Sequence, residues 1–208
     1  MIKPKILLAS SSLYRRQLLQ KLGICFEWQS PNIDESQKSD ENPANLVRRL
    51  AETKARHLAS TFSGYLIIGS DQVATIDNQI IGKPNTHEAA FSQLSNFSQR
   101  EVMFMTGLCL FNPAANRIQT SVETYKVKFR KLTDAQIENY LHRDQPYDCA
   151  GSFKSEGLGI CLFEKLEGDD PNTLIGLPLI ALTRMLANEG IDPLDQPTNF
   201  SQESKCSN

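Results

Sequence analysis

Residues 65–73 join a short apolar run to a single carboxylate, and this stretch is well suited to carry chemistry. The apolar run 66–68 predicts a buried strand. Gly69 and the serine after it allow the backbone to turn, so we expect Asp71 to lie at the exit of that strand. A carboxylate held rigidly there can act as a general base or bind a metal ion, although it can also simply cap a turn.

Basic side chains at three other places in the chain could bind an anion, and Arg15 is the first of them. It falls in the first turn of a helix that we predict at 13–22, behind three serines at 10–12. The helix dipole disfavours cations at that end, so an arginine there makes sense if an anion occupies it. Ser11, backbone N–H groups and Arg15 would then converge on a phosphate, the alternative being an arginine that points to solvent.

Lys54 and Lys83 are the other two candidate phosphate ligands. Lys54 lies close to the apolar stripe of a helix that we predict at 43–61, where a lysine more often extends its amine to the surface. Lys83 stands between Gly82 and Pro84, so its backbone has little freedom. The segment is not a P-loop, because the first glycine and the Ser/Thr after the lysine are missing, but a fixed loop lysine can still bind phosphate.

A second carboxylate, Glu35, lies in a polar loop at 31–43 and could join Asp71 in holding a hard divalent metal ion, Mg²⁺ or Mn²⁺. Such a loop can equally be plain solvated surface. No covalent nucleophile is evident, because neither a Cys–His pairing nor a Gly-x-Ser-x-Gly motif occurs. The chain thus offers cations that can bind phosphate, carboxylates that can hold a metal ion and a base that can activate water. Together these groups favour metal-assisted hydrolysis of a polyphosphate.

Strand-like and helix-like segments follow one another around these residues, without an internal repeat or a linker. We therefore expect one domain at 1–193, followed by a polar, proline-containing flexible tail at 194–208. The predicted strands lie at 5–9, 24–29, 65–73, 101–112, 118–131 and 160–166, and the predicted helices with their caps lie at 13–22, 43–61, 86–97, 133–142 and 173–188.

The composition is that of an ordinary globular protein, and it excludes several classes of partner. The formal net charge is −2 over 208 residues, so no basic surface for non-specific nucleic-acid binding is expected. No run of about 18 apolar residues predicts a membrane-spanning helix. The cysteines form no Cys-x-x-Cys pair, the histidines give no zinc-site spacing, and the N-terminal apolar run is too short for a signal peptide. We therefore expect a cytoplasmic protein.

Several of these motifs occur together in one family, and the chain resembles the Maf-like nucleotide pyrophosphatases over residues 5–193. Any one of the motifs would be weak by itself, but their number and order make the match specific. The matching segments are residues 8–19, Asp34-Glu35, 51–55, 69–73, 82–84, Thr106-Gly107, 149–152, Asn172 and 176–179.

The resemblance implies an α/β fold of the Maf/ITPase type, with a mixed, strongly twisted central sheet, flanking helices and two lobes around a deep cleft. It implies that a nucleoside triphosphate is cut between its α- and β-phosphates, giving a monophosphate and pyrophosphate. In the family pattern Asp71 is the proton acceptor, and the phosphate and metal region is lined by Arg15, Glu35, Lys54 and Lys83. The expected partner is a small nucleotide; neither nucleic acid nor a membrane is expected, and a homodimer is allowed.

Three positions favour the 7-methyl-GTP branch of this family. Tyr14 and Gln72 stand where the branch that acts on thymidine and uridine triphosphates usually has arginine and threonine, and Glu156 stands where it usually has glutamine. N7-methylation makes the purine cationic, so Tyr14 could stack on it and Glu156 could accept hydrogen bonds from its N1–H and exocyclic amine. Each residue also fits a plainer role: Tyr14 could pack in the core, Gln72 could belong to a turn, and Glu156 could lie in a solvated loop.

Other functions stay open at this point. The chain could be a dTTP/UTP pyrophosphatase of the same family, or a non-catalytic regulator of cell division, because family members have been linked to septum formation. A pure binding protein would not need Asp71 beside Lys54 and Lys83. A Nudix-type hydrolase would release the same products, but no glutamate-dense helix of that type is visible.

Overall fold

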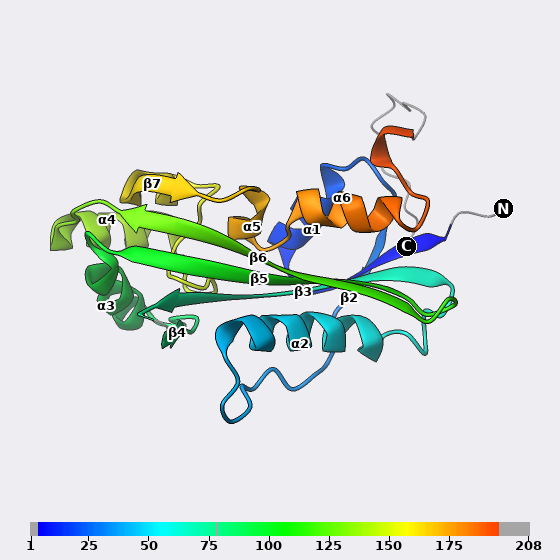
Figure 1. The fold of residues 1–208 in the computed structure, drawn as a ribbon. Helices are drawn as coiled ribbons and strands as arrows, with labels where there is room; N and C mark the ends of the chain where they lie inside the picture. The colour runs from blue at the N-terminus through cyan, green and yellow to red at the C-terminus, as the bar shows by residue number, and fades with distance from the viewer. Residues whose placement is uncertain (1–3, 78, 196–208) are drawn as a thin grey trace.

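The computed structural model describes residues 4–77 and 79–195 of the chain. Within these residues, seven strands and six α-helices follow one another as Figure 1 shows by colour. The strands are β1 (Lys5–Ala9), β2 (Glu27–Gln29), β3 (Tyr65–Ile76), β4 (Gln79–Ile81), β5 (Glu101–Asn112), β6 (Arg117–Phe129) and β7 (Phe163–Glu167). The helices are α1 (Leu13–Gln20), α2 (Pro43–His57), α3 (His87–Phe97), α4 (Asp134–Asp144), α5 (Asn172–Ile175) and α6 (Leu179–Ala187), with short 3-10 helices at Leu158–Leu162 and Pro193–Asp195.

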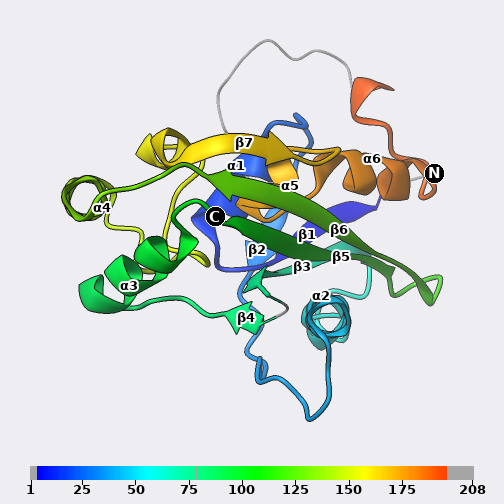
Figure 2. The same ribbon diagram turned by 60° about the vertical axis from the view of Figure 1, so that its left-hand side comes forward.

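The seven described strands belong to one sheet, whose order is β2-β1-β3-β5-β6-β7 with β4 added beside β3. β1 runs parallel to β2 and β3, and the remaining pairs are antiparallel. The long strands β3, β5 and β6 twist as they cross the molecule (Figure 2). The expected mixed, twisted α/β sheet is therefore confirmed.

Helices cover both faces of the sheet at the end that holds β1 (Figure 1). Because side chains alternate along a strand, Leu66 and Ile68 of β3 pack with α1 and α6, whereas Ile67 between them packs with α2. The same alternation continues past the apolar run. It directs Asp71 to the α2 face and Gln72 to the opposite face, toward α5.

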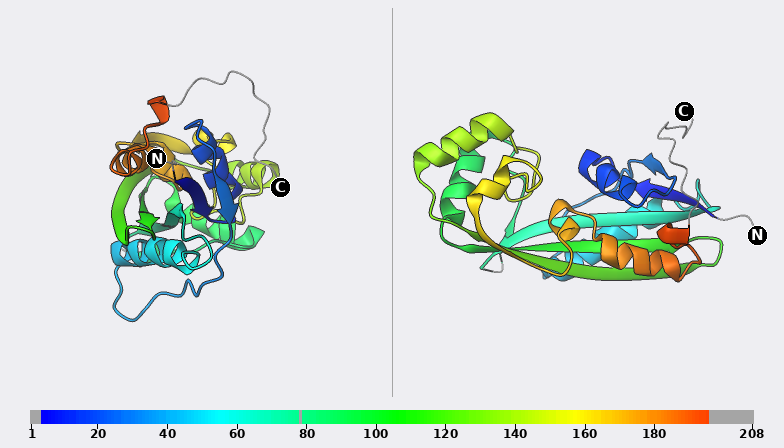
Figure 3. Two further views of the ribbon diagram at one scale, coloured as in Figure 1. Left: turned by 90° about the vertical axis from the view of Figure 1, so that its right-hand side faces the viewer. Right: turned by 90° about the horizontal axis from the view of Figure 1, so that it is seen from above.

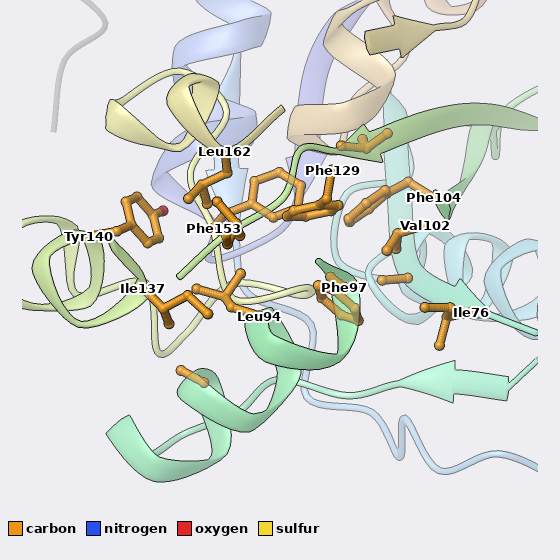
Figure 4. Close-up of a cluster of buried hydrophobic side chains, with 14 of the residues drawn as sticks. Ile76, Leu94, Phe97, Val102, Phe104, Phe129, Ile137, Tyr140, Phe153 and Leu162 are labelled. Atoms are coloured by element: carbon orange, nitrogen blue, oxygen red, sulfur yellow. The ribbon is translucent and has the colours of Figure 1, made fainter. Parts of the chain in front are cut away.

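The two ends of the molecule form lobes joined by the long strands (Figure 3). At the end away from β1, α3 and α4 enclose a core that contains Phe97, Phe104, Phe129 and Phe153, whose neighbouring ring centroids lie 5.3 to 5.7 Å apart (Figure 4). One sheet runs through both lobes, and the single domain at 1–193 stays a prediction. No helix among the described residues is both long enough and apolar enough to cross a bilayer.

The structure corrects the expected position of Asp71 relative to its strand. β3 does not end at Gly69 but continues to Ile76, so Asp71 lies inside the strand and not at its exit. Gly69 makes no turn, because it pairs with Ala9 of β1 on one side and with Cys109 of β5 on the other. Gly69 is needed instead for the close packing of α2 on the sheet.

Other expected boundaries also changed. The helix expected at 173–188 is broken into α5 and α6, because Gly176 adopts a left-handed conformation with a φ of 115°. The strands expected at 24–29 and 160–166 are shorter at their N-terminal ends. Residues 196–208 of the predicted tail lie outside the described residues.

Gly69 and Gly107 let α2 lie very close to the sheet. A Cβ atom added at Gly69 would lie 2.0 Å from the carbonyl oxygen of Ala51, and one added at Gly107 would lie 2.1 Å from that of Val47. Both distances are far below van der Waals contact, so neither position can carry a side chain while α2 stays in place. The two glycines thus set how closely α2, and with it Lys54, approaches β3.

We predict that Gly69→Ala destabilises the protein strongly, because the new methyl group must push α2 away from the sheet. The expected loss in the free energy of unfolding is about 3 kcal/mol, the upper end of the usual overpacking cost. Urea unfolding measures it. Gly64→Ala is the matched control, because its added Cβ would meet no atom within 4 Å. Equal stability of Gly69→Ala and the wild type would contradict the close packing of α2.

Candidate active site

A gap in strand pairing opens one edge of β3. β1 pairs with this edge as far as Gly69, and β4 pairs with it from Ala74 onward. Residues 70–73, between them, have no strand partner at this edge in the part of the chain that the structure describes. The turns that follow β1 and β4 flank the gap, and residues from both line a cavity of about 810 Å³.

Every side chain that the sequence analysis assigned to the site lines this one cavity. They come from the turn and first helix after β1, the loop before α2, α2 itself, β3, the turn after β4 and the loop after α4. The structure thus brings together residues that are dispersed in the sequence, and their chemical roles remain predictions. The residues are Ser11, Tyr14, Arg15, Glu35, Lys54, Asp71, Gln72, Lys83 and Glu156.

A buried ion pair joins Asp71 to Lys54. The Lys54 amine lies 2.7 Å from Asp71 Oδ1 and 2.9 Å from Glu35 Oε1. The side chains of Lys54 and Asp71 are 7% and 9% exposed, whereas that of Glu35 is 57% exposed. Lys54 therefore bridges a buried carboxylate to an open one, and its amine does not extend to the surface. An amine on the apolar face of α2 is tolerated because two carboxylates compensate its charge.

The loop that carries Glu35 is fastened to α2 through Glu41. Nε and Nη2 of Arg49 donate to the two carboxylate oxygens of Glu41 at 2.6 and 2.7 Å, and Nη2 also donates to the Ser36 carbonyl oxygen at 3.0 Å. The hydrogen bonds from Arg49 lower the pKa of Glu41 to about 2, so this carboxylate is charged at neutral pH. The clamp holds Ser36, and with it the neighbouring Glu35, beside α2.

Arg15 is aimed at the cavity by a hydrogen bond to a distant part of the backbone. Its Nε donates to the Gly176 carbonyl oxygen at 2.8 Å, and the Ser70 hydroxyl donates to the same oxygen at 2.8 Å. Burial lowers the pKa of Arg15, whereas the charges of Asp71 and Glu35 raise it, so both carboxylates lie within electrostatic reach of the guanidinium. Arginine stays charged at neutral pH even so.

The N-terminus of α1 also faces the cavity. Ser12 caps the helix by accepting a hydrogen bond from the backbone N–H of Arg15 at 3.3 Å, and Ser11 lies exposed on the cavity wall. Arg16 stacks on Trp28, with its guanidinium carbon 4.1 Å from the ring centroid. Of the two neighbouring arginines, Arg15 is thus the one that lines the cavity.

Lys83 lies on the other side of the gap, in the turn after β4. Its carbonyl oxygen accepts from the Asn85 amide at 3.2 Å, and that of Gly82 accepts from the Gln93 amide of α3 at 3.1 Å. The backbone here is therefore held in place while the Lys83 side chain is exposed along the cavity wall.

Gln72 is part of the framework of the site. Its Nε2 donates to the Thr106 hydroxyl at 2.9 Å and to the carbonyl oxygens of Thr173 and Leu174 at 2.8 and 3.2 Å. The Thr106 hydroxyl in turn donates to the Thr173 carbonyl oxygen at 2.9 Å. These bonds tie α5 to β3 and β5, and both Gln72 and Leu174 of α5 line the cavity.

Tyr14 and Glu156 reach the cavity from different lobes. Tyr14 lies in the first turn of α1, and Glu156 lies in the loop after α4. Burial raises the pKa of Tyr14, and the nearby groups Cys149, Asp148 and Glu156 raise it further. Burial likewise raises the pKa of Cys149 to about 12, so this thiol stays protonated at neutral pH and is not a nucleophile.

Phe153 anchors the loop that carries Glu156, a role that the sequence analysis missed. Its ring contacts those of Phe104 and Phe129, which Figure 4 labels, and that of Phe163, with centroids 4.8 to 5.7 Å away. The next residue, Lys154, donates from its amine to the Asp144 carbonyl oxygen at 2.8 Å. A phenylalanine inside a loop rich in glycine and serine was the available signal, since an apolar ring in such a loop needs a buried partner.

The donor set of the cavity fits a hard divalent cation. Glu35 and Asp71 contact the same Lys54 amine, so both carboxylates lie at one place on the cavity wall. Each uses one oxygen for that contact, so the second oxygen of Glu35 can bind a metal ion. The second oxygen of Asp71 has two lone pairs, and it can contact the ion with one and a water molecule with the other. Carboxylate oxygens together with water and phosphate are the ligands that Mg²⁺ and Mn²⁺ prefer.

Sequence comparison places related proteins along nearly the whole chain. The family model described as Maf-like protein matches residues 5–189. The chain is 54% identical over 198 residues to the 7-methyl-GTP pyrophosphatase of Pseudoalteromonas translucida (strain TAC 125), covering 95% of this chain and 98% of the relative. It is 58% identical over 188 residues to the 7-methyl-GTP pyrophosphatase of Alcanivorax borkumensis (strain ATCC 700651 / DSM 11573 / NCIMB 13689 / SK2). This match covers 90% of this chain and 95% of the relative.

A solved structure with a similar fold is that of the Staphylococcus aureus Ham1 protein. It superposes with a TM-score of 0.50 at 12% sequence identity, covering 89% of this chain and 99% of that protein. At this identity the likeness concerns the fold alone. It agrees with the two-lobed α/β architecture that the sequence predicted.

We predict that Lys54→Met lowers the free energy of unfolding by about 3 kcal/mol, because it leaves the Asp71 carboxylate buried without its partner. Asp71→Asn alone should cost less, since Lys54 keeps Glu35. The double variant Lys54→Met/Asp71→Asn should be more stable than Lys54→Met, with a coupling free energy of about 2 kcal/mol. Urea unfolding of all four proteins measures this cycle.

The matched control for this cycle is Lys5→Met. It removes a lysine whose ion pair with Glu27 spans 3.4 Å between side chains that are 69% and 49% exposed. Such an exposed pair contributes little to stability, because solvent screens the two charges. Additive effects of Lys54→Met and Asp71→Asn would show that the two side chains are not coupled.

Proposed function

The chain belongs to the Maf-like protein family, and on that premise we propose that it is a nucleotide pyrophosphatase whose substrate is 7-methyl-GTP. The products are 7-methyl-GMP and diphosphate. Two relatives that are more than half identical to the chain are named for this activity. The observation that carries the proposal is the convergence of Asp71, Lys54 and Arg15 on one cavity of nucleotide size.

The triphosphate is proposed to bind across the gap in β3. Ser11 and Arg15 approach from the turn after β1, and Lys83 approaches from the turn after β4. Because Gly176 holds Nε of Arg15, the two Nη atoms are directed to phosphate oxygens. Cations on both sides of the gap neutralise the phosphate charge and hold the chain of phosphates across Asp71.

Asp71 is proposed to accept a proton from the attacking water. Lys54 fixes Oδ1 of this carboxylate, so the water is held by Oδ2. The water oxygen forms a bond to the α-phosphorus as the bond from that phosphorus to the bridging oxygen breaks. Diphosphate leaves with the electron pair, and Asp71 then releases its proton to solvent.

Glu35 and Asp71 would hold Mg²⁺ or Mn²⁺ in this site. When bound, such an ion polarises phosphoryl oxygens and offsets the charge that develops on the leaving diphosphate. Lys54 keeps the two carboxylates close together without mutual repulsion, so the ligands are positioned in advance.

Tyr14 and Glu156 are proposed to recognise the base. The 7-methylguanine ring is cationic, so it is attracted to the aromatic face of Tyr14 and to the charge of Glu156. The Glu156 carboxylate can accept from both N1–H and the exocyclic amine of guanine. The same carboxylate repels the carbonyl oxygens of a pyrimidine, which disfavours dTTP and UTP. Gln72 contributes indirectly, by holding α5 against the sheet.

We predict that the purified protein with Mg²⁺ hydrolyses 7-methyl-GTP with a kcat/KM at least about tenfold above those for GTP, dTTP and UTP. The positive charge of the base distinguishes it from GTP, and the hydrogen bonds to Glu156 distinguish it from the pyrimidines. Asp71→Asn should lower kcat by about 10²- to 10⁴-fold without unfolding the protein. Diphosphate release measures both. A preference for dTTP or UTP would refute the substrate, and the absence of diphosphate release from any nucleotide would favour a non-catalytic regulator.

We predict that Glu156→Gln lowers kcat/KM for 7-methyl-GTP by about 10- to 100-fold, because one acceptor and the negative charge are lost. The kcat/KM for GTP, whose base is uncharged, should fall less. The ratio of the two kcat/KM values therefore reports on the charge of the base. Glu164→Gln removes the same charge from an exposed position on β7, outside the cavity lining, and serves as control. An unchanged substrate ratio in Glu156→Gln would exclude Glu156 from base recognition.

A further inference from the structure

A second cluster of metal-binding residue types lies in the lobe of α3 and α4. Glu138 Oε2 lies 2.8 Å from His87 Nε2 and 3.6 Å from His142 Nε2. One ligand atom from each of the three residues lies within 4.8 Å of the others. None of the three residues lines the cavity, so the cluster is separate from the candidate active site.

The two helices assemble this cluster from residues that are far apart in the sequence. Glu138 and His142 are four residues apart on α4, so they share one face of that helix. His87 is the first residue of α3, and its ring centroid lies 5.1 Å from that of His142. The wide separation of the histidines is why their spacing indicated no zinc site.

Both ring nitrogens of His87 have a polar neighbour, Tyr147 at Nδ1 and Glu138 at Nε2. The Tyr147 hydroxyl donates to the Leu141 carbonyl oxygen at 3.5 Å, and its oxygen lies 2.9 Å from His87 Nδ1. When Nδ1–H donates to Tyr147, the lone pair of Nε2 is available to a metal ion; in the other tautomer Nε2–H donates to Glu138. A metal ion bound to Nε2 and Glu138 Oε2 takes the place of the proton that otherwise lies between these two atoms. An outer partner on Nδ1 is also typical of histidines that bind metals.

We propose that His87, Glu138 and His142 form a binding site for a transition-metal dication such as Zn²⁺, with water completing its coordination. Two imidazoles and one carboxylate suit such ions, whereas the oxygen donors of Glu35 and Asp71 suit Mg²⁺. The side chains of His142 and Glu138 are 72% and 44% exposed, so the ion and its water can enter from solvent. This site does not depend on the function proposed above.

The ion would fasten together two segments that form the wall of the cavity. The backbone N–H of Asn85 donates to the Tyr147 carbonyl oxygen at 3.0 Å, so the turn after β4 meets the loop after α4 beside His87. That turn carries Lys83 and that loop carries Glu156. A metal ion between α3 and α4 would thus hold the phosphate side and the base side of the cavity in one arrangement.

Calorimetric titration of the metal-free full chain with Zn²⁺, in excess Mg²⁺, tests the site. The wild type should bind one Zn²⁺ per chain, and its Tm should rise by about 5–10 °C at saturation. His142→Gln should weaken Zn²⁺ binding by more than about tenfold, since even a change in an outer partner costs that much. The exposed His142 side chain makes this variant a safe one for folding.

Two controls separate this site from other Zn²⁺ ligands. His57→Gln removes an exposed histidine of α2 that is not part of the cluster, and Glu35→Gln removes a carboxylate of the cavity. Both should bind Zn²⁺ as the wild type does. Undiminished Zn²⁺ affinity in His142→Gln, or loss of the Zn²⁺ site in Glu35→Gln, would overturn the proposal.

Discussion

The buried contact between Lys54 and Asp71 is the interaction on which the candidate active site depends. It requires α2 to lie close to the sheet, and two glycines, Gly69 and Gly107, make that approach sterically feasible. A charged pair so little exposed is stable because each partner compensates the other, and the more exposed Glu35 shares the same amine. The packing of α2 on the sheet therefore also sets the position of Asp71, the proposed catalytic base.

An incomplete strand edge provides the space in which that pair can act. β1 and β4 leave residues 70–73 of β3 unpaired at one edge within the described chain, and the turns after these strands supply basic side chains on either side. The lobe of α3 and α4 contributes the loop with Glu156, anchored by Phe153. Both lobes therefore contribute side chains to one cavity, and the long strands join them.

Residue types and their local setting predicted much of this site. A carboxylate after an apolar run, an arginine in a first helical turn and a lysine between glycine and proline all line one cavity. The expected strand exit at Asp71 was wrong, because Gly69 resembles a turn residue in the sequence but serves close packing. The contacts of Ser70, Thr106 and Gly176 were not predicted, since a hydrogen bond to a backbone carbonyl more than sixty residues away leaves no local pattern.

Hydrophobic periodicity and caps by themselves indicated the helices and strands, and residue types indicated the chemistry of the ligand set, because these depend on neighbouring residues. The order of the motifs carried the family resemblance, and that resemblance implied the class of fold. Tertiary structure alone decided which charges meet. Lys54 could have reached for solvent, and His87 and His142 could have stayed apart, until the packing of α2 on β3 and of α3 beside α4 set their partners. Contacts between distant segments follow from how whole elements pack, and no stretch of sequence encodes that packing locally.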